Sequence, residues 1–265
     1  MTQINNITPG KSNIQRRIAY VLAMSFGLIA VVCQATPALQ ESQNMTSTSI
    51  ASELLSVRQQ AILPIAAFAA VGDLPRLNTA LNQGLDTGLS VSDAREVLVQ
   101  LYAYAGFPRS LNALGELMKV LDARKQRGIQ DIQGQAPSHS IPTGEALLIA
   151  GTANQTKLVG SPVKGPVFYF APAIDEYLKT HLFGDIFERD NLDWQSRELA
   201  TMGMLASLQG VEPQLQAHMR ISLNVGITAK QLRQAVQVLE DRVDADTAMR
   251  ARNALEHLLA AMPGH

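Results

Sequence analysis

The sequence predicts an all-α protein built from two similar helical units, and three observations carry this prediction. Apolar residues recur three and four positions apart along most of the chain, and short connections with Gly or Pro separate these periodic segments. Strand signals are almost absent, and the one candidate, residues 166–170, is expected to form an apolar loop packed on helices. Seven residues also recur identically 138 positions later, which indicates an internal repeat. The matched pairs are Gly72 and Gly210, Pro75 and Pro213, Leu77 and Leu215, Leu85 and Leu223, Gly88 and Gly226, Arg95 and Arg233, and Leu101 and Leu239.

The repeat divides the chain into two all-helical units, at residues 53–125 and 186–262, joined by a crossover at 126–185. This crossover is long for a compact domain, so it is either disordered or ordered over a functional face. Within it, residues 145–150 have the pattern of a helical turn, and residues 167–183 are too apolar to be left in water. The two repeats most simply pack as pseudo-symmetric partners around one shared core.

Helix boundaries are clearest in the second unit. Asp193 is a suitable N-cap for the segment that follows it, and Pro213 is a favourable first-turn residue of the next helix. Gly226 can end that helix in the left-handed conformation. Thr228 and Gln231 have the spacing of a capping box, in which each side chain accepts a backbone hydrogen bond at the start of a third helix.

The N-terminus has the pattern of an export signal. Basic residues, the last of them Arg17, precede the uncharged and mostly apolar stretch 18–32, and the small residue Ala35 follows. We expect residues 1–35 to be removed on export, residues 36–52 to form a flexible leader, and the mature protein to be periplasmic or secreted. A membrane anchor is the alternative, although a span needs about 20 apolar residues.

Cys33 is the only cysteine and lies in the segment that cleavage would remove. The mature chain would then have no disulfide, no thiol nucleophile and no cysteine ligand for a metal. Attachment of a lipid to Cys33 is a weaker alternative, because Val32 stands where a small residue normally precedes such a cysteine. The chain has 22 Lys and Arg against 23 Asp and Glu, so it has no basic excess that would favour binding to nucleic acid.

Several short motifs, in the same order in the chain, resemble the carboxymuconolactone decarboxylase-like family. In the second unit they are LDWQSRE at 192–198, GVEPQL at 210–215, His218 and LNVGIT at 223–228. In the first unit they are GLS at 88–90 and YAYAGFPRSLNAL at 102–114. The resemblance implies an all-α fold shared with alkylhydroperoxidase-D-like proteins, here as two such repeats packed as one pseudo-symmetric domain. It also implies a symmetric homo-oligomer, for which a trimer is our expectation.

The resemblance leaves the chemistry open between two branches of the family. One branch acts on a lactone carboxylate in aromatic catabolism. The other is a thiol peroxidase that uses a Cys-x-x-Cys pair near a glutamate and a histidine. Residues 210–213 occupy the matching region here and contain no cysteine, so peroxidase activity is not expected.

Glu198 and His218 are the candidate catalytic residues. We expect Glu198 in the first turn of one helix and His218 in the second turn of the next, so that a helical hairpin brings them to one end of the unit. A carboxylate beside an imidazole suits proton transfer near neutral pH. The repeat places Ala61 and Ala80 opposite them, so the fold alone does not require either polar group. The alternative is that Glu198 stabilises a helix end and His218 only packs.

Tyr104 and Arg109 are the candidate substrate-binding residues of the first unit. Tyr104 could line a pocket, and Arg109 could hold a substrate carboxylate through two parallel hydrogen bonds, although a surface ion pair is the commoner role of such an arginine. His181 lies close in sequence to Asp185 and Glu188, but the spacing matches no metal site and favours a solvated helix end.

Together with Glu198 and His218, the resemblance implies acid–base chemistry without a metal or a cofactor, on a small carboxylate or lactone. The alternative is a non-catalytic binding or scaffold protein that has kept the fold. Beyond the small-molecule substrate, the expected partner is a second copy of the chain, with no nucleic acid and no membrane once the signal is removed.

Overall fold

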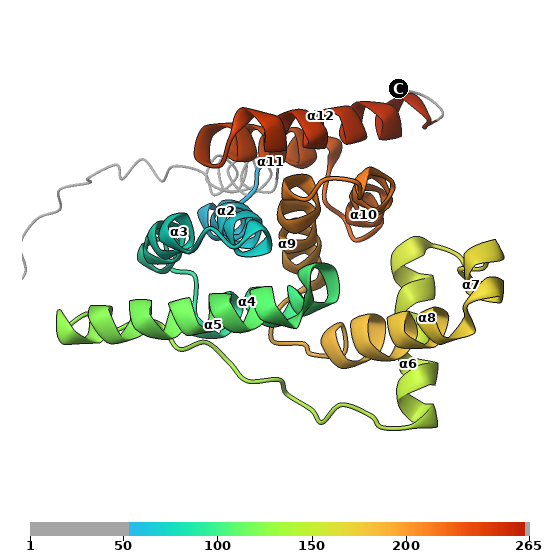
Figure 1. The fold of residues 1–265 in the computed structure, drawn as a ribbon, viewed down its shortest axis with the longest axis horizontal. Helices are drawn as coiled ribbons and strands as arrows, with labels where there is room; N and C mark the ends of the chain where they lie inside the picture. The colour runs from blue at the N-terminus through green and yellow to red at the C-terminus, as the bar shows by residue number, and fades with distance from the viewer. Residues whose placement is uncertain (1–52, 263–265) are drawn as a thin grey trace, which may run out of the picture. The chain divides into compact units, whose positions relative to one another are not determined.

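The computed structural model describes residues 53–262, and this part of the chain is helical without strands, which confirms the all-α prediction. The first unit contains α2 (Val57–Val71), α3 (Leu74–Asp86), α4 (Val91–Gln100) and α5 (Tyr102–Gln126). The crossover contains α6 (Glu145–Val159), α7 (Pro166–Phe170), α8 (Pro172–Tyr177) and the π-helix η1 (Leu178–Ile186). The second unit contains α9 (Trp194–Ser207), α10 (Glu212–Asn224), α11 (Ala229–Arg242) and α12 (Ala245–Ala260) (Figure 1).

The predicted signal and leader, residues 1–35 and 36–52, lie outside the described residues. Within residues 53–262, no helix combines the length and the apolar character needed to cross a bilayer.

The helix boundaries expected from the sequence are present. The Asp193 side chain accepts a hydrogen bond from the Ser196 amide at the start of α9, and Thr228 forms the capping box with Gln231 at the start of α11. Ser90 caps α4 in the same way. Gly226 has φ of 94°, a left-handed conformation that favours glycine at the end of a helix.

The helices of the two units follow each other in the same order and at nearly the same spacing. α3 begins at Leu74 and α10 at Glu212, 138 residues later, and the same separation relates the starts of α4 and α11. The starts of α2 and α9 are 137 residues apart. The register of the sequence match is therefore also the register of these helix starts.

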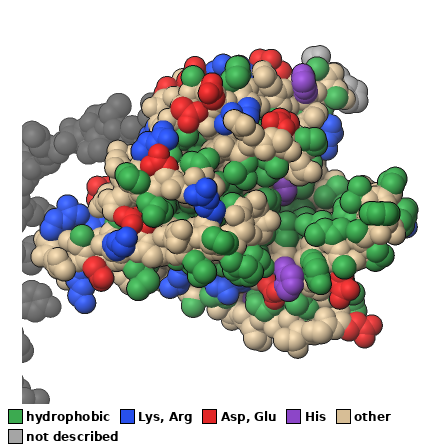
Figure 2. All heavy atoms as spheres, viewed as in Figure 1, with side chains coloured by type: hydrophobic (Ala, Val, Ile, Leu, Met, Phe, Trp, Pro, Cys, Tyr) green, Lys and Arg blue, Asp and Glu red, His purple; other side chains and the backbone are tan. Residues whose placement is uncertain are grey.

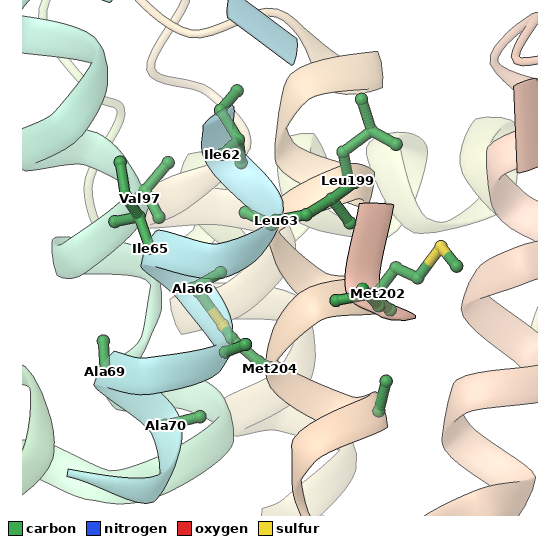
Figure 3. Close-up of a cluster of buried hydrophobic side chains, with 14 of the residues drawn as sticks. Ile62, Leu63, Ile65, Ala66, Ala69, Ala70, Val97, Leu199, Met202 and Met204 are labelled. Carbon is green, nitrogen blue, oxygen red and sulfur yellow. The ribbon is translucent and has the colours of Figure 1, made fainter. Parts of the chain in front are cut away.

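Helices α2 and α9 pack against each other in the centre of the largest core (Figure 3). A Cβ atom on Gly203 would come within 2.6 Å of the Leu63 carbonyl oxygen and 3.1 Å of the Ala66 Cβ, so the two backbones approach closely at this crossing. Buried side chains of both units belong to this one hydrophobic cluster. The close approach of α2 and α9 thus joins the two units.

The crossover is more regular than the sequence suggests. The predicted turn at 145–150 extends to the 15 residues of α6. α6 packs on η1, and Gly151 lies so close to the Lys179 carbonyl that a side chain at this position would overlap it. A second hydrophobic cluster forms where these two helices meet α10, with Leu158, Phe183 and Ile221 in its interior.

Two expectations for residues 166–170 are wrong, whereas Leu182 and Phe183, at the end of the apolar stretch 167–183, are buried as expected. Residues 166–170 form the short helix α7 rather than a loop, because Pro166 supplies a favourable φ at its first position. The side chains of α7 are also not packed on other helices: Tyr169 is 71% and Phe170 91% exposed. Figure 2 shows hydrophobic side chains gathered over α7 and α8. Periodicity alone did not show that these side chains are exposed.

Helix α5 also exposes apolar side chains, at Phe107, Leu111 and Met118. Their spacing of four and seven residues places them on one face of the helix. Exposed apolar stripes of this kind mark many contact surfaces between proteins. The expected homo-oligomer, with a trimer as its form, stays a prediction.

Candidate functional site

Glu198 is fully buried in α9. The sequence predicted Glu198 in the first turn of the helix. It is the fifth residue of α9 and so lies just beyond that turn. At this position its carboxylate does not face the free amides of the helix end. It faces α10, which packs against α9, and its partner there is His218.

His218 lies in the second turn of α10, as expected, and is 9% exposed. Its Nδ1 atom is 2.8 Å from Oε2 of Glu198. When the Glu198 carboxylate is ionised it only accepts hydrogen bonds, and Nδ1 then carries the proton in this contact. In the neutral ring Nε2 then has the free lone pair, and Nε2 is the atom that can take a proton from a ligand.

Tyr104 of the first unit completes the group. Its ring lies edge-to-face against the His218 ring, with centroids 5.5 Å apart and an interplanar angle of 77°. The Tyr104 hydroxyl is buried and lies beside Thr201 of α9. Burial and the nearby Glu198 carboxylate raise the pKa of Tyr104 far above its ordinary value. The hydroxyl therefore stays protonated near neutral pH.

Local backbone geometry places Tyr104 at the start of α5. The helix is interrupted at Gly106, which has φ of 81° and ψ of 162°, directly before Phe107 and Pro108. Tyr104 precedes this kink, whereas Arg109 follows it. The two side chains predicted to bind substrate are therefore on different sides of a change in helix direction.

Arg109 does not join the group. Its side chain is exposed, and its guanidinium covers Gly72 at the end of α2, where a Cβ atom would overlap it. The contacts that the structure describes for Arg109 include none with Glu198, His218 or Tyr104. Tyr104 and Arg109 are neighbours in one sequence motif, which suggested a shared role, but the kink at Gly106 separates them.

A buried ionic network beside Glu198 was missed from the sequence. The guanidinium of Arg197 is fully buried and contacts Glu96 Oε2 at 3.2 Å and the Arg189 carbonyl at 2.8 Å. Arg189 makes two further hydrogen bonds to Glu96, of 2.6 and 2.8 Å. Gln100 donates to the Arg197 carbonyl and to the Thr201 hydroxyl. These groups fix the first turns of α9 against α4, and so fix the position of Glu198.

The network shifts the ionisation of its members. Burial lowers the pKa of Arg197, against the opposing effect of Glu96. For Glu96, burial acts to raise the pKa, but hydrogen bonds from Arg189 and the charge of Arg197 outweigh it and hold the pKa below its ordinary value. In the sequence, this network is indicated only by the position of Arg197 beside Glu198 in a motif. Its partner Glu96 lies 101 residues away, so the pairing could not be predicted from sequence spacing.

The crossover covers one side of the group with apolar side chains. Tyr104 packs against both hydrophobic clusters, and the second cluster contributes residues of α6, η1 and α10 around it. Of the two alternatives for the crossover, the structure therefore shows an ordered segment rather than a disordered one. An apolar cover of this kind strengthens electrostatic interactions beneath it.

The other candidate, His181, contacts Asp185 at 3.0 Å on an exposed surface of η1. Glu188 does not join them; its carboxylate accepts a hydrogen bond from Asn154. Within residues 53–262, no three or more His, Asp or Glu side chains are placed together to hold a metal ion.

Comparison with known families gives one match. Residues 172–257 match the model of the carboxymuconolactone decarboxylase family. The matched range contains Glu198 and His218, and it begins in α8, before the second unit. No curated protein matches the chain. At the level of the family, the match supports a carboxymuconolactone decarboxylase-like or alkylhydroperoxidase-D-like protein.

Proposed function

We propose that this chain is a carboxymuconolactone decarboxylase-like enzyme that transfers a proton with Glu198 and His218, without a cofactor, on a small lactone or carboxylate. The observation that carries this proposal is the buried hydrogen bond of 2.8 Å between the two side chains. The family match over residues 172–257 agrees with it.

The roles follow from the atoms in contact. Glu198 accepts the Nδ1 proton, which holds the ring in one tautomer and orientation and stabilises the imidazolium that forms when Nε2 gains a proton. Nε2 then returns the proton to the ligand or to water. Tyr104 limits the position of the ring from the other side through the edge-to-face contact.

The two units, in our proposal, are tandem repeats packed as pseudo-symmetric partners. The near-constant separation of the helix starts supports this, as do the capping boxes at Ser90 and Thr228. Gly203 and Ala66, which meet where α9 crosses α2, are also 137 residues apart, the separation of the two helix starts. A contact between equivalent positions is what a local two-fold axis requires.

Replacement of His218 by Gln tests the catalytic proposal. We expect turnover, measured by NMR with a panel of small lactones and carboxylates in D2O, to fall by about 10²–10⁴-fold, because the group that moves the proton is lost. Turnover by Glu198→Gln should fall by a similar factor. Turnover by the double variant should be little lower than that of either single variant, since the two side chains act as one unit.

His181→Gln is the matched control, because it makes the same substitution at an exposed histidine that also contacts a carboxylate. It should leave turnover unchanged. Full activity of His218→Gln would remove the pair from the mechanism. Binding without turnover in the unaltered protein would favour a binding or scaffold protein instead.

A further inference from the structure

Large apolar side chains are exposed along residues 167–177 of the crossover, and we call them the α7–α8 patch. They are Val167, Tyr169, Phe170, Ile174 and Tyr177. No residue of α7 or α8 is buried, so the described part of the chain leaves the patch uncovered. Figure 2 shows hydrophobic side chains gathered over these two helices. Helix α7 also precedes the range that matches the family model.

The patch is large for a monomeric protein. Tyr169, Phe170 and Tyr177 are 71%, 91% and 55% exposed. Since an aromatic side chain has about 150–250 Å² of surface, these three expose about 300–550 Å² together. Val167 and Ile174 add to this area. The largest apolar patch of a typical monomer is about 300–600 Å², and each side of a stable protein interface covers about 800 Å². The α7–α8 patch therefore supplies most of one side of such an interface.

The residues beside the patch carry one unpaired charge of each sign. Lys164 lies just before α7, and Glu176 lies next to Tyr177 in α8. Both are exposed, and neither has an ion pair within residues 53–262. Asp175 and Lys179 are already paired with each other. In a two-fold contact between identical surfaces, each residue meets a partner position whose own residue is met in return. Lys164 of each copy can then pair with Glu176 of the other.

We infer that the α7–α8 patch binds the same patch of a second copy of this chain in a two-fold contact, with the aromatic side chains at its centre and Lys164 opposite Glu176 at its edge. An apolar centre with a polar rim is the usual composition of protein interfaces. A lipid surface fits less well, because segments that bind anionic lipid carry clusters of Lys and Arg, and here one unpaired lysine is balanced by one unpaired glutamate. Self-association through the patch does not require the chemistry proposed above.

Sedimentation velocity of the full chain over a range of concentrations tests the pairing. We expect particles of two chains, or of six where the expected trimer also forms, because a two-fold contact joins chains in pairs. Tyr169→Ser combined with Phe170→Ser should weaken the pairing by at least about 100-fold, since both aromatic side chains leave the centre of the contact in both copies. Leu111→Ser on α5 is the matched control, because Leu111 is also an apolar residue that is 64% exposed. It should leave the pairing unchanged.

Reversal of the two rim charges tests whether the partner is the same chain. Lys164→Glu places two carboxylates opposite each other at both ends of the contact, and we expect it to weaken the pairing by about tenfold at low salt. Glu176→Lys should weaken it by a similar factor. The variant with both reversals restores opposite charges when both partners carry them, so its affinity should return to within about threefold of that of the unaltered protein.

A full chain that stays monomeric, or that assembles only into threes, would overturn the inference. The same holds for pairing that Leu111→Ser weakens and the combined Tyr169 and Phe170 variant does not. A double charge reversal that pairs no more tightly than either single reversal would contradict the two-fold arrangement. Binding to vesicles of phosphatidylglycerol and phosphatidylethanolamine without self-association, lost in the combined Tyr169 and Phe170 variant, would assign the patch to a lipid surface instead.

Discussion

The two units have corresponding helices but differ where the candidate chemistry lies. In the proposed repeat, Glu198 and His218 in α9 and α10 correspond to Ala61 and Ala80 in α2 and α3, and both alanines are buried. The first unit therefore forms its helical hairpin without either polar group. Because a buried carboxylate costs free energy that alanine does not, packing alone gives no reason for the pair. This difference supports a functional role for the second unit's hairpin.

The first unit contributes to the same site in another way. Tyr104 comes from α5, and Glu96 of α4 holds Arg197 beside Glu198. The candidate site is thus assembled from both units, and neither contains it alone.

The α2–α3 hairpin should tolerate a buried carboxylate much less well than the α9–α10 hairpin does. Placing a carboxylate in α2 should therefore give the largest change in stability. Ala61→Glu buries a charge without a partner, and we expect it to lower the free energy of unfolding by about 3–5 kcal/mol in urea denaturation. Ala61→Gln adds nearly the same volume without the charge, so the difference between the two variants isolates the electrostatic part.

The reverse exchange should be mild. Glu198→Met combined with His218→Leu replaces a buried pair by apolar side chains of similar size, which is often neutral or stabilising by about 1–4 kcal/mol. Its activity should be lost. A loss of stability as large as that of Ala61→Glu would instead show that the pair is part of the structural framework.

The sequence predicted those features that depend on local patterns. Helix ends follow from short-range hydrogen bonds, so Asp193, Thr228 and Gly226 could be assigned without a structure. The placement of Glu198 and His218 near each other was also predictable, because a helical hairpin relates them, whereas their distance of 2.8 Å was not. The ionic contact of Glu96 with Arg197 and the exposure of Phe170 were not, because both depend on which distant helices pack together.

The ionic network should make stability depend on pH. The pKa of Glu96 is held below its ordinary value in the folded state, so its stabilising contribution is present above the unfolded-state pKa of about 4.3 and is lost as the pH falls below it. We expect Glu96→Gln to lower the free energy of unfolding at pH 7 by about 2–3 kcal/mol and to flatten its decrease between about pH 5 and 3.

Glu240→Gln provides the control for this measurement. Glu240 pairs with Arg252 at 2.6 Å, but both side chains are exposed. Surface ion pairs contribute at most about 1 kcal/mol to stability. The free energy of unfolding of Glu240→Gln should therefore be close to that of the unaltered protein, both at pH 7 and between about pH 5 and 3. Equal losses in Glu96→Gln and Glu240→Gln would contradict the structural role of the buried network.

The smallest effects should come from two glycines that distinguish the shared helix crossing from a helix exterior. A methyl group on Gly203 would meet the Leu63 carbonyl at 2.6 Å, and backbone atoms of α2 cannot move aside without loss of packing. We expect Gly203→Ala to cost about 1–3 kcal/mol. The residue of α2 that faces Gly203 is Ala66. The crossing therefore accommodates the Cβ atom of Ala66 but not a second one on Gly203.

Gly115 of α5 is the opposite case, because a Cβ atom there would meet nothing within 4 Å. Gly115→Ala should raise the free energy of unfolding by about 0.4–1 kcal/mol, since alanine restricts the unfolded chain and favours helix. Urea denaturation of the two variants under the same conditions compares them directly. A stabilisation of both would show that α2 and α9 tolerate a wider separation than the structure has, and the crossing would then not be what joins the two units.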